Sequence, residues 1–205
     1  MQINIDRKTG VLVGVIVLLA AAVVSLSVNR SDTTNVMGSG SGHMGHGSSS
    51  SSNANYTGAD IMFLQMMIPH HQQAIDISNL ALKSSQDPEL IELAKIIARD
   101  QAAEIKQMKA WLADAGASED MGHSMDGMGG MLNDDELAAL SAATGKEFDV
   151  LWLKGMTEHH DGAIHMTTMI RDASNPDIKA FGEKVVADQS AQIEQMKAMI
   201  ARLSA

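Results

Sequence analysis

Two short motifs in this sequence carry the side chains best suited to bind a metal ion. Each has the pattern Met-x-x-His-His, and the two copies, 89 positions apart, comprise Met67, His70 and His71, then Met156, His159 and His160. Imidazole nitrogen is a good ligand for copper and zinc, and the soft thioether of methionine selects Cu(I). The repeated motif therefore predicts a copper site, with Cu(I) favoured and Cu(II) also acceptable.

On a helix, residues four positions apart lie on one face, so each motif could present an imidazole and a thioether together. The pairs with this spacing are Met67 and His71, Met156 and His160, Met66 and His70, and His165 and Met169. Adjacent helix residues, however, point about 100° apart, so the two histidines of a pair cannot both face one narrow site. One histidine of each pair could then be solvated or cap a neighbouring group, and the methionines could be ordinary core residues.

A glycine-rich stretch between the two motifs, residues 117–131, holds a second group of candidate ligands. These are Met121, His123, Met125, Met128 and Met131. Their close spacing would let several thioethers converge on one ion, although a disordered loop with incidental methionines is the alternative. A third candidate is His43 with His46 in a Ser/Gly-rich segment. This pair could be a metal-catching tether, a chance occurrence or the remnant of an expression tag.

The composition narrows the classes of function. The chain has 16 methionines but only 2 Trp, 1 Tyr and 3 Phe, and it has no cysteine. Without cysteine there are no disulfides and no thiolate metal sites. Where thiols tend to be oxidised, outside the cytoplasm, methionine and histidine persist as ligands. The net charge of −10 argues against binding to nucleic acid, because no basic face is available to neutralise phosphates. A metal cation or a basic partner remains compatible with that charge.

The elements that must position these residues are expected to be helices. Apolar residues recur at helical spacing over about 57–84, 88–116, 134–143, 145–172 and from 176 almost to the C-terminus. The predicted boundary signals are Asp87 with Pro88, Gly116, the capping boxes Asn133–Glu136 and Thr144–Glu147, and Asn175 with Pro176. Pro69 predicts a kink just before the first histidine pair. Since a long internal repeat means one unit used twice, the sequence predicts an all-α four-helix bundle made of two repeated helical hairpins.

Residues 1–30 are expected to form a signal anchor or transmembrane helix. An uncharged run of 18 residues, 11–28, follows Arg7 and Lys8, which fits a marginal membrane span with the N-terminus in the cytoplasm. An uncleaved anchor is favoured over a cleaved signal peptide. Residues 31–55 have the composition of a flexible linker, and 56–205 would form the bundle with the loop 117–131. We expect a membrane-anchored protein whose bundle faces the periplasm or the extracellular side, or a secreted protein if the signal is cleaved.

The two motif segments, residues 63–75 and 152–164, resemble the DUF family numbered 305, which includes the CopM-like copper-binding proteins. The resemblance covers about residues 56–205. It implies a ferritin-like helical bundle outside the cytoplasm that serves copper resistance by sequestration or transfer. For a buffering or transfer role, a copper donor or acceptor protein is a candidate partner. The ligands that it implies are Met67, His70, His71, Met156, His159 and His160.

Other classes of function find less support in the sequence. A ferritin-like di-iron oxidoreductase needs Glu on two helices and Glu-x-x-His on two others, and no glutamate stands three residues before a bundle histidine. Asp100 and Asp188 recur but leave the carboxylate count short. Hydrolysis by a nucleophile lacks both a cysteine and a serine in a nucleophile elbow. A membrane-tethered structural or partner-binding bundle stays as an alternative. We expect a copper-binding protein that is not an enzyme.

Overall fold

A computed structural model describes residues 55–122 and 129–204, and within these ranges all regular structure is helical. The elements are α2 (Gly58–Ser84), α3 (Pro88–Ala115), α4 (Asp134–Ala142), α5 (Gly145–Met166), the 3-10 helix η1 (Thr167–Ile170) and α6 (Pro176–Ser204). The prediction of an all-α fold is therefore confirmed for this part of the chain.

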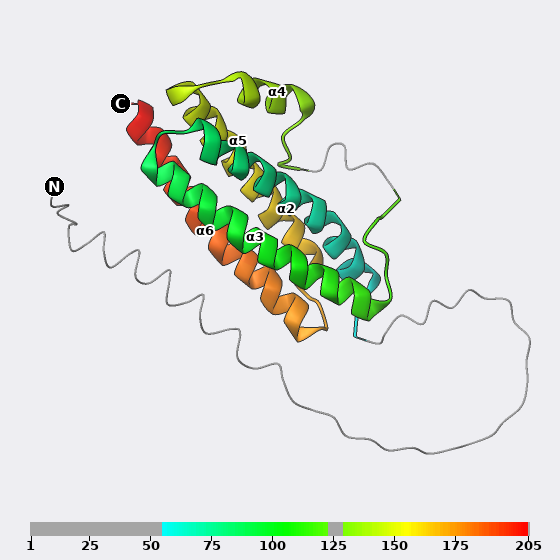
Figure 1. The fold of residues 1–205 in the computed structure, drawn as a ribbon. Helices are drawn as coiled ribbons and strands as arrows, with labels where there is room; N and C mark the ends of the chain where they lie inside the picture. The colour runs from blue at the N-terminus through cyan, green and yellow to red at the C-terminus, as the bar shows by residue number, and fades with distance from the viewer. Residues whose placement is uncertain (1–54, 123–128, 205) are drawn as a thin grey trace, which may run out of the picture. The chain divides into compact units, whose positions relative to one another are not determined.

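The four long helices lie side by side in a bundle (Figure 1). Helix α2 packs along α3, and α5 packs along α6, so each half of the sequence repeat forms a helical hairpin. The two hairpins meet mainly where α2 contacts α5. The short helix α4 packs against α5 and carries the chain from the loop after α3 into the second hairpin.

Capping side chains set most helix ends where the sequence predicts them. The carboxylate of Asp87 accepts the first free N–H groups of α3, and Pro88 is the first residue of that helix. Gly116 ends α3 in the left-handed conformation with φ of 66°, which glycine adopts without a steric penalty. Asn133 and Glu136 form the predicted capping box at the start of α4.

Helix α5 departs from the prediction at both ends. The capping box predicted for Thr144 is wrong, because its side chain makes no capping hydrogen bond. The next residue, Gly145, has φ of 56°, so the backbone does not enter the helix in the geometry that a capping box needs. At the other end α5 stops at Met166 rather than near 172. The Thr167 and Thr168 hydroxyls bond carbonyls three residues back, and this competes with regular α-helical bonding.

Pro69 lies inside α2, and the helix continues through it from Gly58 to Ser84. The proline therefore does not end the element that carries the first histidine pair. The bend predicted at this position stays a prediction.

The core is divided into two apolar clusters. The Trp152 cluster includes Ala74, Ile97, Met156 and Ile193, and the Phe63 cluster includes Met67, Ile105, Ala163 and Val185. On every long helix, the change from one cluster to the other takes place at buried polar residues: His70 and His71 on α2, Gln101 on α3, His159 and His160 on α5, and Gln189 on α6. The middle of the bundle is thus a polar layer between two apolar clusters.

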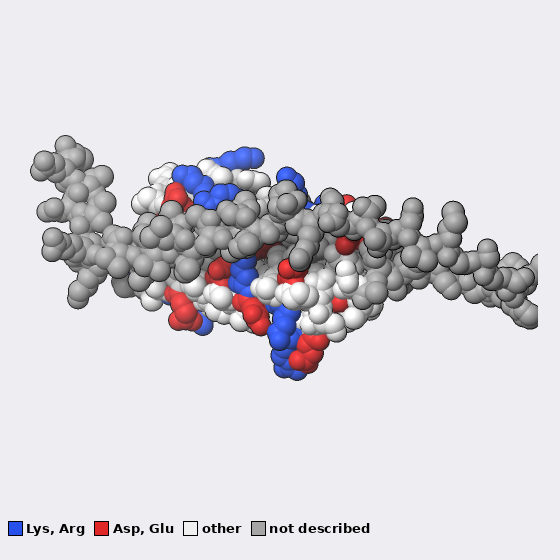
Figure 2. All heavy atoms as spheres, turned by 90° about the horizontal axis from the view of Figure 1, so that it is seen from below, with Lys and Arg blue, Asp and Glu red and all other residues white. Residues whose placement is uncertain are grey.

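Acidic and basic side chains are interspersed on the face of the bundle shown in Figure 2, where described atoms are visible. None of the helices in the described ranges is long and apolar enough to cross a membrane. The predicted anchor at 11–28 and nearly all of the predicted linker, with His43 and His46, lie outside the described residues.

Candidate metal centre in the polar layer

The four motif histidines form the centre of the polar layer, and all four side chains are fully buried. We call His70, His71, His159 and His160 the histidine tetrad. The idea that one histidine of each pair is solvated is therefore wrong. Each helix of a bundle has two neighbours, so residues about 100° apart can both be buried, one against each neighbour.

The inner pair of the tetrad joins α2 to α5. The rings of His70 and His159 contact each other, with centroids 3.8 Å apart and planes inclined by 40°. Within the described residues, none of the four nitrogens in these two rings has a hydrogen bond of good geometry, although the Gly129 backbone lies near enough to His70 to act on its pKa. Buried polar atoms without partners are rare in proteins, because each forfeits its hydration without a replacement bond. A metal ion bound to these nitrogens would supply the missing partner.

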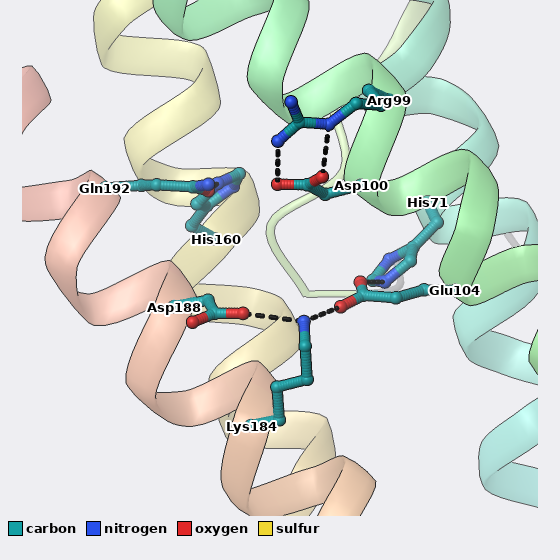
Figure 3. A network of polar contacts seen from close by, with 8 residues as sticks. All are labelled: His71, Arg99, Asp100, Glu104, His160, Lys184, Asp188 and Gln192. Atoms are coloured by element: carbon teal, nitrogen blue, oxygen red, sulfur yellow. Dashed lines mark hydrogen bonds and ion pairs between the residues drawn. The ribbon is translucent and has the colours of Figure 1, made fainter. Parts of the chain in front are cut away.

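The outer pair faces the second helix of each hairpin. The Nε2 atom of His71 lies 2.9 Å from Oε2 of Glu104 on α3, and Nε2 of His160 lies 2.6 Å from Oε1 of Gln192 on α6 (Figure 3). Carboxylate and amide oxygens only accept, so each imidazole donates its Nε2–H. In a neutral imidazole held in this way the second nitrogen, Nδ1, carries no proton, and Nδ1 is buried in both rings with no hydrogen-bond partner among the described residues. An anchored remote N–H and a free second nitrogen are typical of metal-binding histidine.

The environment keeps most of the tetrad neutral. Burial lowers the pKa of His70 to about 3 and the pKa of His160 to about 4. Burial, reinforced by the neighbouring histidines, also holds the pKa of His159 well below its ordinary value. At neutral pH these rings therefore carry no proton on at least one nitrogen, and that is the form in which imidazole binds a metal.

An ion-pair network lies beside the outer pair (Figure 3). The ammonium of Lys184 on α6 is 2.8 Å from Oε1 of Glu104 and 2.7 Å from Oδ2 of Asp188. Burial would raise the pKa of Glu104, but its hydrogen bond with His71 and the charge of Lys184 hold that pKa below its ordinary value. Glu104 is thus a carboxylate in direct contact with a tetrad imidazole.

Four polar residues of this layer were not among the predicted ligands: Gln101, Glu104, Gln189 and Gln192. Gln101 and Gln189 are buried, and each has side-chain atoms with no hydrogen-bond partner among the described residues. The available signal was the interruption of the apolar stripe of α3 by Gln101, repeated on α6 by Gln189.

The structure separates the two motif methionines. Met67 and Met156 are fully buried, but Met67 belongs to the Phe63 cluster and Met156 to the Trp152 cluster. They therefore lie on opposite sides of the polar layer, each about one helical turn from its own histidines. Both are core residues, and each is near enough in sequence to be a thioether neighbour of the tetrad.

The other helical pairs are placed less favourably. Met66 is half-buried at the margin of the Phe63 cluster. His165 is exposed and Met169 is half-buried, so this pair lies at the surface of α5 and η1 rather than in the polar layer. The structure does not bring the His165 pair together with the tetrad.

The methionine-rich loop ends next to the tetrad. Met121 and Met131 are half-buried, whereas His123, Met125 and Met128 lie outside the described residues. Residues 129–132, which we call the strap, lie on both central helices. The Gln73 side chain accepts from the Leu132 N–H and donates to its carbonyl, both at 2.8 Å. A Cβ added to Gly162 would come within 2.0 Å of the Gly129 carbonyl oxygen, so the strap lies directly on the α5 backbone.

The candidate metal ligands in the polar layer are mainly the imidazole nitrogens of the tetrad. In the described ranges, no three His, Asp or Glu side chains converge as a ready-made site for one ion. Asp100 and Asp188, the carboxylates considered for a di-iron centre, are paired with Arg99 and Lys184 at the surface (Figure 3). A soft ion that tolerates few ligands fits this donor set better than a carboxylate-bridged iron pair.

Comparison with known proteins identifies close structural relatives. The family described as a domain of unknown function (DUF305) matches residues 60–200. A DUF305 protein from Streptomyces coelicolor, described as a candidate secreted protein, is 32% identical over 72% of this chain and 93% of its own, with a TM-score of 0.66. A DUF305 fragment from Deinococcus radiodurans is 30% identical over 71% of this chain and 97% of its own, with a TM-score of 0.67.

The solved structures that resemble this chain also include CopM. Its Cu(I)-bound form is 33% identical over 72% of this chain and 97% of its own, with a TM-score of 0.59. CopM has also been solved in Cu(II)-bound, Ag-bound and apo forms. None of the curated proteins matches this sequence.

Proposed function

This chain belongs to the DUF305 family, and from that premise we propose that it binds copper through the histidine tetrad. The observation that carries the proposal is the set of six buried ring nitrogens that have no hydrogen bond of good geometry within the part of the chain that the structure describes. A core that only had to be stable would place apolar side chains there, because unpaired polar atoms destabilise the fold. A role as ligands explains why they are kept.

Copper is favoured over other metals by the donor chemistry. Neutral imidazoles with neighbouring thioethers suit Cu(I), and imidazoles alone also accept Cu(II). Met67 and Met156, one helical turn from the tetrad, are the thioethers best placed to complete such a site. The similarity to CopM, which has been crystallised with Cu(I), Cu(II) and Ag, supports this assignment.

We further propose a role in copper sequestration, buffering or transfer outside the cytoplasm, without catalysis. The bundle would be a ferritin-like scaffold made from a duplicated hairpin, and residues 1–30 would anchor it to the membrane or direct its secretion. A copper donor or acceptor protein would be its partner. The methionine-rich residues of the loop 117–131 and the pair His43 and His46 would act as auxiliary ligands.

The direct test is an anaerobic titration of the intact chain with Cu(I) in competition with a chromophoric chelator. The test variant is His70→Leu with His159→Leu, which removes the unpaired inner rings and keeps a similar volume. The matched control is Met125→Leu with Met128→Leu, which removes two loop thioethers. A third variant, Met67→Leu with Met156→Leu, tests the neighbouring thioethers.

We expect tight Cu(I) binding by the unaltered protein and by the loop variant, a clear loss in the histidine variant and a smaller loss in the motif methionine variant. If the loop variant loses binding and the histidine variant keeps it, the bundle would instead be a scaffold for a methionine-rich loop. Failure of the unaltered chain to bind Cu(I) would contradict the proposed function.

A further inference from the structure

The two halves of the polar layer differ in one chemically important position. Residues of α6 follow their counterparts on α3 by 88 positions, so Gln189 corresponds to Gln101. By the same offset, Gln192 corresponds to Glu104. The repeat therefore places a carboxylate in one hairpin where the other hairpin has an amide of nearly the same size and shape.

Both side chains hold the outer histidine of their own hairpin. Glu104 contacts Nε2 of His71 at 2.9 Å, and Gln192 contacts Nε2 of His160 at 2.6 Å. Each contact anchors the ring and leaves its Nδ1 atom buried with no hydrogen-bond partner in the described ranges. The geometry is thus shared by the two halves, whereas the charge behind the imidazole is not.

The carboxylate behind His71 is also paired with a cation, Lys184 of α6. Lys184 contacts the second oxygen of Glu104 at 2.8 Å and is 47% exposed, while Glu104 is only 12% exposed. The counterpart of Lys184 in the first repeat is Ile96. The Lys184 ammonium therefore neutralises the charge of Glu104 only in part, because water solvates its exposed side.

A carboxylate behind a metal-binding imidazole changes what the ring binds. A carboxylate makes the free imidazole nitrogen a more basic metal ligand than an amide does, because the proton shared with the carboxylate is drawn away from the ring. The negative charge also stabilises a divalent ion more than a monovalent ion, and it does so more effectively away from water. The positive charge of Lys184 acts against this preference for the divalent ion.

We propose that the two outer histidines are inequivalent and that Glu104 is the positioning residue that biases the His71 half of the centre toward Cu(II). The His160 half, backed by a neutral amide, is then the half better suited to Cu(I). This inference rests on the proposed function, because it describes how the same tetrad divides its preference between the two oxidation states.

The test measures Cu(I) and Cu(II) affinities of the full chain by chelator competition, together with the reduction potential of the copper-loaded protein. In Glu104→Gln, the amide keeps the hydrogen bond, as Gln192 shows in the other half, but the charge is lost. We expect Cu(II) affinity to fall about 10- to 100-fold, the usual range for a residue that supports a metal ligand. Cu(I) affinity should change less. The reduction potential rises by about 59 mV for each tenfold loss of Cu(II) affinity relative to Cu(I) affinity.

Two further variants make the sign of the effect diagnostic. Lys184→Met removes the counter-ion of Glu104 and should lower the potential, opposite to Glu104→Gln. Gln192→Glu installs a carboxylate behind His160 and should also lower it. A merely structural role of Glu104 would not produce opposite shifts from the loss of an anion and the loss of its cation.

The outcomes separate this inference from the proposed function. If the unaltered protein binds neither Cu(I) nor Cu(II), the proposed function and the role of Glu104 are both contradicted. If it binds copper at the tetrad and the three variants leave the potential unchanged, or shift it in one common direction, the proposed function stands and the role of Glu104 is contradicted. Opposite shifts for Glu104→Gln and Lys184→Met would support it.

Discussion

At the scale of single residues, the tetrad shows a conflict between stability and binding. His70 and His159 are fully buried, and their ring nitrogens have no hydrogen bond of good geometry with any described residue. Without a metal ion such atoms destabilise the folded protein, because their hydration is lost and nothing replaces it. Sites kept for function commonly have this property, and replacing them can increase stability.

The double substitution His70→Leu with His159→Leu should therefore stabilise the metal-free protein. The gain should be on the order of 1–3 kcal/mol if the penalty of the unpaired nitrogens is relieved. Thermal or urea unfolding of the metal-free variants measures it. His165→Leu is the matched control, because His165 lies on α5 but is exposed, and it should have little effect. A double variant much less stable than the original would mean that these rings make bonds in the folded state.

The same burial predicts how stability depends on pH. His70 and His160 have folded-state pKa values of about 3 and about 4, below the ordinary histidine value of about 6.5. Between these values the unfolded chain binds protons that the folded chain does not, so falling pH favours unfolding. The stability of the metal-free protein should be highest above about pH 6.5 and decrease toward pH 4, by up to about 1.4 kcal/mol per pH unit for each such histidine.

Urea unfolding at several pH values measures this dependence. The variant His70→Leu with His159→Leu should have a shallower slope than the original chain. Equal slopes in the two proteins would contradict the lowered pKa values of the inner histidines in the folded state.

At the scale of elements, the strap links the methionine-rich loop to the two helices that carry the tetrad. It is attached to α2 through Gln73 and lies on α5 at Gly162. Gln73 and Gly162 each follow a histidine of the inner pair by three positions, which is about one helical turn. The loop is therefore tied to the bundle close to the candidate centre.

Gly162→Ala should dislodge the strap, because the new Cβ would lie within 2.0 Å of the Gly129 carbonyl oxygen. Hydrogen exchange at the Leu132 amide, which Gln73 holds in the original chain, should become faster. Gly58→Ala on α2 is the control, since an added Cβ there would meet nothing within 4 Å. Unchanged exchange in Gly162→Ala would contradict the tight contact between strap and helix.

The helix caps give a second prediction at this scale. Asp87→Ala should destabilise the fold by about 1 kcal/mol, because Asp87 accepts from two N–H groups at the start of α3. Thr144→Ala should stay within about 0.5 kcal/mol of the original, because Thr144 makes no capping bond. Urea unfolding distinguishes the two. Equal losses of stability in the two variants would show that Thr144 caps α5 as the sequence predicts.

At the scale of the whole molecule, the core is two apolar clusters separated by a polar layer that all four long helices share. The sequence repeat predicts only that one hairpin is used twice, so that the two histidine pairs take equivalent positions in the two halves. Helix ends with strong local signals, such as Asp87 with Pro88 and Gly116, were also predictable from local chemistry alone.

The features that could not be predicted depend on how helices are paired. The burial of both histidines in each pair arises because each helix has two neighbours, which spacing along one helix does not reveal. The contacts of His71 with Glu104 and of His160 with Gln192 join residues 33 and 32 positions apart. The separation of Met67 from Met156 likewise follows from the packing of α2 on α5.

The central claim is that copper binds to the buried imidazoles rather than to the loop methionines alone. X-ray absorption of the Cu(I)-loaded intact chain tests this directly, because imidazole rings and thioether sulfur scatter differently around the metal. We expect the outer-shell scattering of imidazole in the original protein, and its marked decrease in the variant His70→Leu with His159→Leu. A spectrum with sulfur ligands only, unchanged by that substitution, would contradict the account.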